Sequence, residues 1–223
     1  MFVTDGAVFM ISLLGFSQIC IDLIKNTIAK DCQTMLFSAT YSDEVMDFVK
    51  RIIEKPVIFR LKHEEQSLSN IFVRQFYIEC NNDEEKYDAV KTIYLSITIR
   101  LAMIFCCYKQ LTVEQRAAII NRFRNGKFRV LVVTNVCARG INIEDISLVI
   151  NYDMPVTVDF KPDYETYLHR IAPCGRFGKL GYTFNFIGSE KDFNTMKAIE
   201  EYFHHPIVEI TIDDISNLEQ DQE

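Results

Sequence analysis

The sequence contains no phosphate-binding loop of the form Gly-x-x-x-x-Gly-Lys-Ser/Thr. Such a loop cradles the phosphates of a nucleotide with its backbone N–H groups, so no stretch of this chain is predicted to hold them in that way. The seven cysteines are odd in number and include no Cys-x-x-Cys pair, which argues against a disulfide framework and against a structural zinc site. We therefore expect a reducing compartment.

The sequence also lacks an excess of positive charge. Its 24 lysines and arginines are outnumbered by 31 aspartates and glutamates, which gives a net charge of -7. A protein that grips nucleic acid by bulk charge has the opposite balance. Any contact with nucleic acid must therefore come from a local groove.

No hydrophobic run is long enough to cross a membrane. The apolar residues 7–16 fall short of the roughly 20 that a transmembrane helix needs, and they follow Asp5 instead of the basic residues that begin a signal peptide. We expect a buried helix or strand end there, and no membrane association. With 223 residues, 48% of them hydrophobic, the chain can bury the core of one large or two small domains.

Two clusters of arginine and glycine follow predicted strands. Residues 130–133 form a short β-branched and aliphatic run, typical of a strand buried on both faces of a parallel sheet, and residues 134–142 then turn polar. A second cluster occupies residues 169–178. Ligands of open α/β sheets bind beyond the carboxyl ends of the strands, so the two clusters predict an anion site there, with phosphate as the obvious ligand.

These clusters resemble motifs of the DEAD-box RNA helicases. Residues 130–142 resemble motif V, residues 169–178 are similar to motif VI (usually His-Arg-Ile-Gly-Arg-Thr-Gly-Arg), and the Ser-Ala-Thr of residues 38–40 is similar to motif III. The wording of residues 134–140 and 163–170 is most similar to the mRNA-export branch of the family, which works at the nuclear pore. The resemblance extends from about Phe2 to about Asp214, with one gap.

The resemblance implies a set of ligands and partners. The cofactors would be ATP and Mg²⁺, and the substrate would be single-stranded RNA, bound without sequence preference. Partners would include mRNA-export factors of the nuclear pore. The expected location is the cytoplasm and nucleus, including the nuclear-pore periphery.

The resemblance assigns three site residues in the first part of the chain. In the family an Asp-Glu-Ala-Asp segment holds Mg²⁺ and aligns the attacking water; here Asp5 matches, but Gly6 and Val8 replace two of its carboxylates. A carboxylate acting on water contributes about 10²–10⁴ in rate, and neither replacement can supply it. Ser38 and Thr40 would couple the nucleotide site to the second lobe. The alternatives are a polar residue closing a strand for Asp5 and a helix entry for the triplet.

Motif V supplies most of the implied RNA contacts. By resemblance, Thr134, Arg139 and Arg116 bind RNA, whereas Gly140 and Asn142 lie against ATP. The family has Asp in place of Asn142, and an amide can still hydrogen bond a hydroxyl but without charge. The alternative for Arg139 is a side chain that only fixes a turn.

Motif VI carries the remaining catalytic assignments. His169 and Arg170 match the family, and Arg176 keeps one of its two arginine fingers, which would also touch ATP. The other finger falls on Pro173 and is lost. An arginine finger contributes about 10³–10⁵ in rate. A histidine near a helix end is equally often a capping or core residue, so that alternative stays open for His169. No residue is assigned as a metal ligand.

The resemblance implies an α/β fold with a RecA-like parallel sheet flanked by helices. Residues 1–62 would be a remnant of the N-terminal lobe, 63–70 a linker, 71–212 the C-terminal helicase lobe, and 213–223 a frayed acidic tail. Apolar alternation, Pro and Gly positions and capping residues predict the elements. Strands are expected at 2–7, 33–37, 56–61, 71–80, 102–106, 130–133, 146–152, 181–187 and 206–212, and helices at 17–29, 42–53, 83–97, 112–123, 164–171 and 189–203.

The second lobe is shorter than the family pattern. Residues 107–111 stand where the family places a whole helix and strand. Because parallel sheets grow in strand-plus-helix units, the remaining chain can still cross over through the next helix. We expect a vacant lane in the sheet and, beside it, hydrophobic surface that is exposed or repacked.

Three functional hypotheses remain. The first is an ATP-dependent RNA helicase. The second is a catalytically inactive RecA-like fragment that binds RNA or a protein partner. The third is the product of a decayed or mis-spliced gene. The losses at Gly6, Val8 and Pro173 favour a chain without ATP hydrolysis.

Overall fold

A computed structural model shows the chain as two compact units, residues Met1–Leu61 and Lys62–Glu223. No helix in the part of the chain that it describes is long and apolar enough to cross a bilayer. The described residues are 2–3, 21–22, 26, 35–36, 43–53, 55–59, 72–106, 122–134, 145–175 and 179–218.

The first unit contains one parallel strand pair and one long helix among its described residues. Strand β1 (Phe2–Val3) pairs with β2 (Met35–Leu36), so the cores of two predicted strands are confirmed. Helix α3 (Asp43–Ile52) confirms the amphipathic helix expected at 42–53. Its buried side chains are Met46, Phe48 and Val49, of which Met46 and Val49 are three positions apart, as on one helical face.

The strand expected at residues 56–61 is wrong over its described part. Residues 56–59 have no strand pairing, and Val57, Ile58 and Phe59 are exposed. A strand needs a partner for its backbone N–H and C=O groups, and Pro56 has no N–H to donate. Lys55, with φ of 54°, turns the chain just before it. The hydrophobic composition of this segment therefore predicted a strand that its backbone does not form.

The described strands of the second unit form a six-stranded sheet in which every pairing is parallel, in the order β5-β4-β6-β7-β3-β8. The predicted RecA-like parallel sheet is thereby confirmed. Strands expected at 206–212 and 71–80 are shorter than predicted. The strand bounds are β3 Val73–Glu79, β4 Leu101–Phe105, β5 Val130–Val133, β6 Ile146–Asn151, β7 Gly181–Ile187 and β8 Val208–Glu209.

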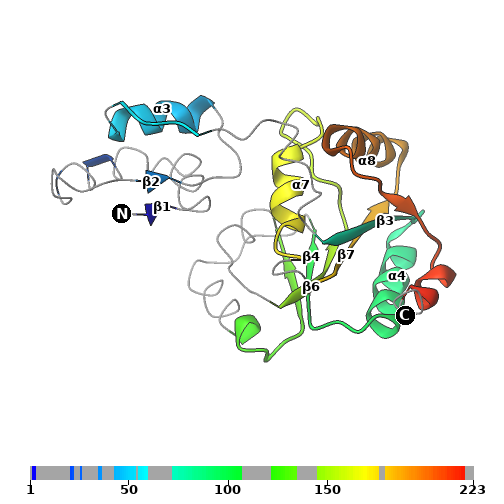
Figure 1. The fold of residues 1–223 in the computed structure, drawn as a ribbon. Helices are drawn as coiled ribbons and strands as arrows, with labels where there is room; N and C mark the ends of the chain where they lie inside the picture. The colour runs from blue at the N-terminus through cyan, green and yellow to red at the C-terminus, as the bar shows by residue number, and fades with distance from the viewer. Residues whose placement is uncertain are drawn as a thin grey trace. The chain divides into compact units, whose positions relative to one another are not determined.

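Helices cover both faces of this sheet (Figure 1). On one face α7 (Tyr164–Ile171) and α8 (Glu190–Phe203) pack against the core cluster that includes Met103 and Phe105 of β4. On the other face α4 (Asp83–Ser96) packs against the cluster that includes Ala102 and Ile104 of the same strand. Successive side chains of a strand point to opposite faces, so one apolar run serves both cores.

Each of these three helices begins at a side-chain cap. The cap of α4 is Asn82, whose Oδ1 accepts a hydrogen bond from the Glu85 N–H at 2.9 Å. The cap of α8 is Ser189, as its predicted start at 189 requires. The cap of α7 is Asp163, which accepts from the Thr166 N–H at 2.9 Å. Caps of this kind satisfy backbone donors that the helix leaves unpaired.

The frayed tail expected at 213–223 is wrong for its described part. Residues Asp213–Asn217 form the 3-10 helix η4, which packs on α4. Ile215 is completely buried in the same core cluster as α4. Thr211 donates its backbone N–H to the Asp214 carboxylate at 3.0 Å and so fixes the start of the turn. The acidic composition of this segment predicted disorder, although Ile215 supplies an apolar side chain that packs in the core.

The described strands leave no vacant lane between them. Strands β4 and β5 pair directly, with Ala102 opposite Val130. Strand β5 is the last described strand at its end of the sheet, and its Val132 is 58% exposed. A strand missing from this order would therefore belong at an edge, because each neighbouring pair in the interior is already hydrogen-bonded.

Burial in the sheet predicts a sharp contrast between two identical substitutions, one in strand β6 and one in an exposed loop. Val149→Ala in β6 removes methyl groups from a side chain that is 0% exposed and should lower the free energy of unfolding by about 1.5–3 kcal/mol. Val158→Ala, at a loop residue that is 96% exposed, should change it by less than about 0.5 kcal/mol. Urea denaturation followed by circular dichroism measures both. Equal losses would contradict the core assignment.

Candidate functional site

Three of the predicted site residues lie in the part of the chain that the structure describes: Thr134, His169 and Arg170. The others lie outside it, so their roles stay predictions. These are Asp5, Ser38, Thr40, Arg116, Arg139, Gly140, Asn142 and Arg176.

Thr134 and Arg170 lie at the carboxyl edge of the sheet. Thr134 directly follows β5, and the Cys106 N–H donates to the carbonyl of the neighbouring Val133 at 3.0 Å. Arg170 reaches the last residues of β4 and β6 from helix α7. Both residues therefore belong to the edge at which open α/β sheets bind ligands.

The guanidinium of Arg170 is buried, with 3% of the residue exposed. Its Nη1 donates to Asn151 Oδ1 at 2.9 Å and to the carbonyl of Asp153 at 2.7 Å. The same group lies over the Phe105 ring, 5.0 Å from its centroid. A buried cation needs such partners because its desolvation is costly. Arg170 thus fixes the end of β6 against the end of β4.

A chain of buried polar side chains continues from this arginine into the sheet. Asn151 donates its Nδ2 to Asn185 Oδ1 at 2.8 Å, and Asn185 donates to the carbonyl of Phe76 at 2.9 Å. Asn185 Nδ2 also lies 3.3 Å from the hydroxyl of Tyr167. Each member is hydrogen-bonded, as buried polar groups require.

The chain ends near the surface at His205. Tyr167 donates its hydroxyl to Gln75 Oε1 at 2.5 Å, and Gln75 Nε2 lies 2.9 Å from His205 Nδ1. Burial raises the pKa of Tyr167 far above its usual value, so the hydroxyl keeps its proton. The sequence did not predict this network of residues. Their available signal was Asn151 and Asn185, single polar residues inside apolar strands.

His169 lies on the same helix and pairs within it. Its Nε2 is 3.6 Å from Glu165 Oε1, one helical turn earlier. The two residues are four positions apart, the spacing at which helix side chains meet. The contact gives His169 a partner within its own helix, and its functional role stays a prediction.

Helix α7 ends in a tightly packed turn before the predicted Arg176. Pro173 is buried just beyond the helix end, where a residue without an N–H cannot continue the hydrogen-bond ladder. Gly175 has φ of 75°, and a Cβ there would lie 2.6 Å from the Phe72 carbonyl oxygen. Only glycine fits this position without a shift of the backbone.

The donor set does not fit the magnesium site that the family implies. Of the family's carboxylates Asp5 remains, whereas Gly6 and Val8 offer no side-chain oxygen. Mg²⁺ requires near-octahedral oxygen ligands. Within the described ranges, no three His, Cys, Asp or Glu residues converge on a point that could hold a metal ion.

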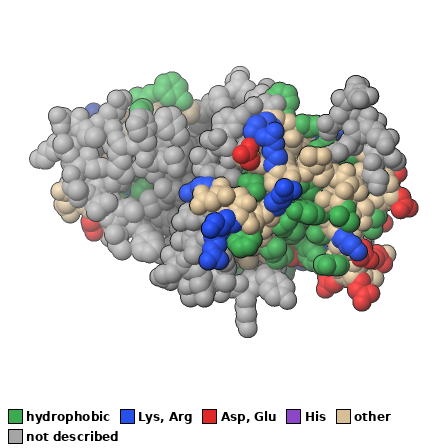
Figure 2. Space-filling view, turned by 90° about the horizontal axis from the view of Figure 1, so that it is seen from below, with side chains coloured by type: hydrophobic (Ala, Val, Ile, Leu, Met, Phe, Trp, Pro, Cys, Tyr) green, Lys and Arg blue, Asp and Glu red, His purple; other side chains and the backbone are tan. Residues whose placement is uncertain are grey.

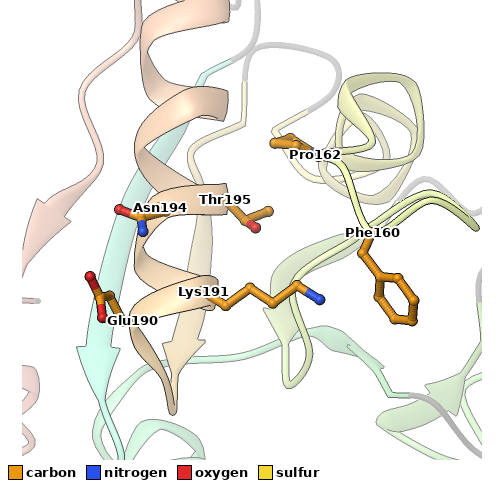
Figure 3. A pocket seen from close by; sticks show the side chains of 6 residues that line it. All are labelled: Phe160, Pro162, Glu190, Lys191, Asn194 and Thr195. Atoms are coloured by element: carbon orange, nitrogen blue, oxygen red, sulfur yellow. The ribbon is translucent and has the colours of Figure 1, made fainter.

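An open pocket of about 510 Å³ lies between the loop before α7 and the first turns of α8 (Figure 3). Lys191 lies over the Phe160 ring, 4.0 Å from its centroid. Of the predicted site residues that the structure describes, Thr134, His169 and Arg170, none lines the pocket. Its lining residues are Phe160, Pro162, Glu190, Lys191, Asn194 and Thr195.

Comparison with known proteins places this geometry in a family. Residues 60–178 match the model of the helicase conserved C-terminal domain. The ATP-dependent RNA helicase DDX19A of Mus musculus is 42% identical over 241 residues, covering 98% of this chain and 50% of that protein. The Dbp5 of S. cerevisiae bound to RNA and ADP BeF3 superposes with a TM-score of 0.82 at 32% identity, covering 98% of this chain and 61% of that one. A Dbp5 variant bound to Gle1 and IP6 gives 0.81 at 28% identity, with 99% and 61% covered.

The matched domain and the parallel sheet define the second unit as a RecA-like C-terminal lobe of a helicase. The chain belongs to the DEAD-box RNA helicase family, as its motifs predicted. It spans about half the length of the curated relatives it matches.

The buried position of Arg170 predicts that a lysine cannot replace it. Arg170→Lys should lower the free energy of unfolding by about 1–3 kcal/mol, because a single ammonium cannot reproduce the planar contacts with Asn151, Asp153 and Phe105. The matched control is Arg124→Lys, at an exposed residue, which should cost less than about 0.5 kcal/mol. Urea denaturation measures both. An unchanged stability in Arg170→Lys would show that these contacts do not hold the edge.

Proposed function

We propose that this chain binds single-stranded RNA through the carboxyl edge of the second unit, without sequence preference, and hydrolyses no ATP. The observation that carries the proposal is the likeness of 98% of the chain to Dbp5 bound to RNA and ADP BeF3. Thr134 lies at this edge in the described structure. Arg139 and Arg116 are proposed to join it in contacting phosphates.

The proposed loss of hydrolysis rests on substitutions within the chain. Gly6 and Val8 replace carboxylates of the segment that aligns the attacking water, and Pro173 replaces an arginine finger. The first loss is worth about 10²–10⁴ in rate and the second about 10³–10⁵. Together they leave too little catalysis for turnover. Six residues of the family's catalytic set are retained: Asp5, Ser38, Thr40, His169, Arg170 and Arg176.

The chain is proposed to keep contacts with a nucleotide although it does not hydrolyse ATP. Gly140, Asn142 and Arg176 keep nucleotide-facing positions of the family pattern. Asn142 can donate to or accept from a ribose hydroxyl. A nucleotide would then act as a ligand of the second lobe and would not be consumed.

The proposed domain organisation follows the family. Residues 1–62 are taken as part of the first lobe, 63–70 as the linker, 71–212 as the second lobe without one helix and strand, and 213–223 as an acidic tail. The aligned region of DDX19A is 241 residues long, more than the 223 of this chain, so the relative has residues without a counterpart here. This difference in length supports the proposed deletion of one helix and one strand.

The proposed partners and location also come from the relatives. Dbp5 has been solved in complexes with Gle1 and with Nup159. We propose that this chain likewise meets mRNA-export factors, in the cytoplasm and nucleus and at the periphery of the nuclear pore.

Loss of ATP hydrolysis is tested by phosphate release in the presence of RNA. The chain and its Arg176→Ala variant should give the same background rate, because removing a finger cannot slow a reaction that does not occur. A higher rate in the unmodified chain would refute the proposed inactivity.

RNA binding is tested by its salt dependence, measured by fluorescence anisotropy of a labelled oligouridine. Binding to phosphates releases counterions, so the logarithm of the binding constant should fall linearly with the logarithm of the salt concentration. Arg139→Ala should reduce that slope by about 0.7, the value for one phosphate contact on a single strand. The control is Lys91→Ala, on the exposed surface of α4. Binding that ignores both salt and Arg139 would exclude a phosphate groove at this edge.

A further inference from the structure

Basic side chains gather at the amino edge of the sheet in the second unit, opposite the edge that carries Thr134. All of them are exposed, and in Figure 2, which views the molecule from this side, Lys and Arg side chains surround exposed apolar ones. We call this set the amino-edge patch. Its members are Arg100, Arg122, Arg124, Lys127, Arg129 and Lys179.

The sheet order brings these residues together from distant parts of the chain. Arg129 immediately precedes β5 and Arg100 immediately precedes β4, and the Ala102 N–H donates to the Arg129 carbonyl at 2.8 Å. Lys179 lies two residues before β7. Because parallel strands begin at the same edge and lie about 5 Å apart, the basic residues of β5, β4 and β7 form a row of roughly 15 Å.

One carboxylate lies within the row and holds two of its members in place. Asp145, just before β6, is 2.9 Å from Lys179 Nζ and 3.4 Å from Arg100 Nη1. The hydrogen bond from Lys179, with that of Arg100, keeps the pKa of Asp145 below its usual value, so it stays ionised. Lys179 and Arg100 therefore share one ionised partner in the row.

The other four members form no ion pair with a described carboxylate. Six cations and the acidic pair Glu144 and Asp145 leave an excess of about four positive charges in these segments of the sequence, in a chain whose net charge is -7. The local charge is thus opposite in sign to the net charge of the chain. A local cluster of positive charge of this kind is typical of a site that binds a polyanion. The four members without an ion pair to a described carboxylate are Arg122, Arg124, Lys127 and Arg129.

An aromatic ring lies inside the patch. Phe128, between Lys127 and Arg129, is 48% exposed. An exposed ring flanked by cations is the arrangement on which bases of single strands stack while the phosphates meet the charges. A duplex keeps its bases stacked inside and has no use for such a ring. The patch therefore matches a single strand better than a duplex.

We propose that the amino-edge patch is a second binding surface for single-stranded RNA, in which Phe128 stacks on a base and the surrounding arginines and lysines contact phosphates. It goes beyond the proposed function, which uses the opposite edge of the same sheet. Its geometry depends on the described strands β4, β5, β6 and β7 and on no residue of the carboxyl edge.

The test compares two triple variants of the full 223-residue chain that lose the same charge. Arg122→Gln, Arg124→Gln and Arg129→Gln neutralise the patch. Lys50→Gln, Lys91→Gln and Lys161→Gln, all at exposed residues, form the control. Binding of labelled oligouridine is measured across a range of salt concentrations. The patch variant should reduce the salt slope by about 2, from three contacts at about 0.7 each, and the control should leave it unchanged.

A second measurement locates the RNA. Ultraviolet cross-linking of the oligouridine, followed by peptide mapping, should attach it to the peptide that contains Phe128, and Phe128→Leu should abolish that cross-link. Equal slopes in the two triple variants, or no cross-link at Phe128, would overturn the inference. So would preferential binding of anionic vesicles or of duplex RNA by the patch.

The outcome separates this inference from the proposed function. If Arg139→Ala weakens binding while the patch variant does not, the carboxyl edge binds RNA and the amino-edge patch does not. If the patch variant alone weakens binding, the reverse holds. A chain that binds no oligouridine at low salt refutes both proposals.

Discussion

The buried guanidinium of Arg170 is the constraint on which the carboxyl edge depends. It holds the ends of β4 and β6 in one arrangement through Phe105, Asn151 and the carbonyl of Asp153. A cation can occupy such a place only if its partners are fixed, and those partners belong to different strands. The position of Thr134, one strand further along, follows from the same register. The motif therefore contributes to the architecture of the site whether or not it acts on a ligand.

The sequence predicted the second unit well because its signals are local. Apolar runs such as residues 148–150 are buried on both faces, as in a covered parallel sheet, and Asn82, Asp163 and Ser189 mark helix starts by their own hydrogen bonds. The family membership was readable in the motifs, and the comparisons confirmed it.

The failures share a physical cause, which is that pairing partners are invisible in a linear pattern. Pro56 and the apolar residues after it were expected to form a strand, but strand formation needs a neighbour with free backbone groups. Ile215 was assigned to a frayed tail because acidic residues surround it, and α4 supplied the surface that orders it. The polar network from Asn151 to Gln75 was missed for the same reason. Each of its hydrogen bonds joins residues far apart in sequence.

The hydrogen-bonded chain from Arg170 to His205 also has a consequence for how this lobe can lose its structure. It links the end of β6, the middle of β7, helix α7, strand β3 and the segment after α8. Opening any one of these hydrogen bonds would leave a polar group without a partner in an apolar interior. The free-energy cost would also weaken the neighbouring hydrogen bonds of the network. Partial melting from either side of the sheet is therefore discouraged. The lobe should therefore unfold as a single cooperative unit, in which the carboxyl edge of the sheet and helix α8 lose their structure together.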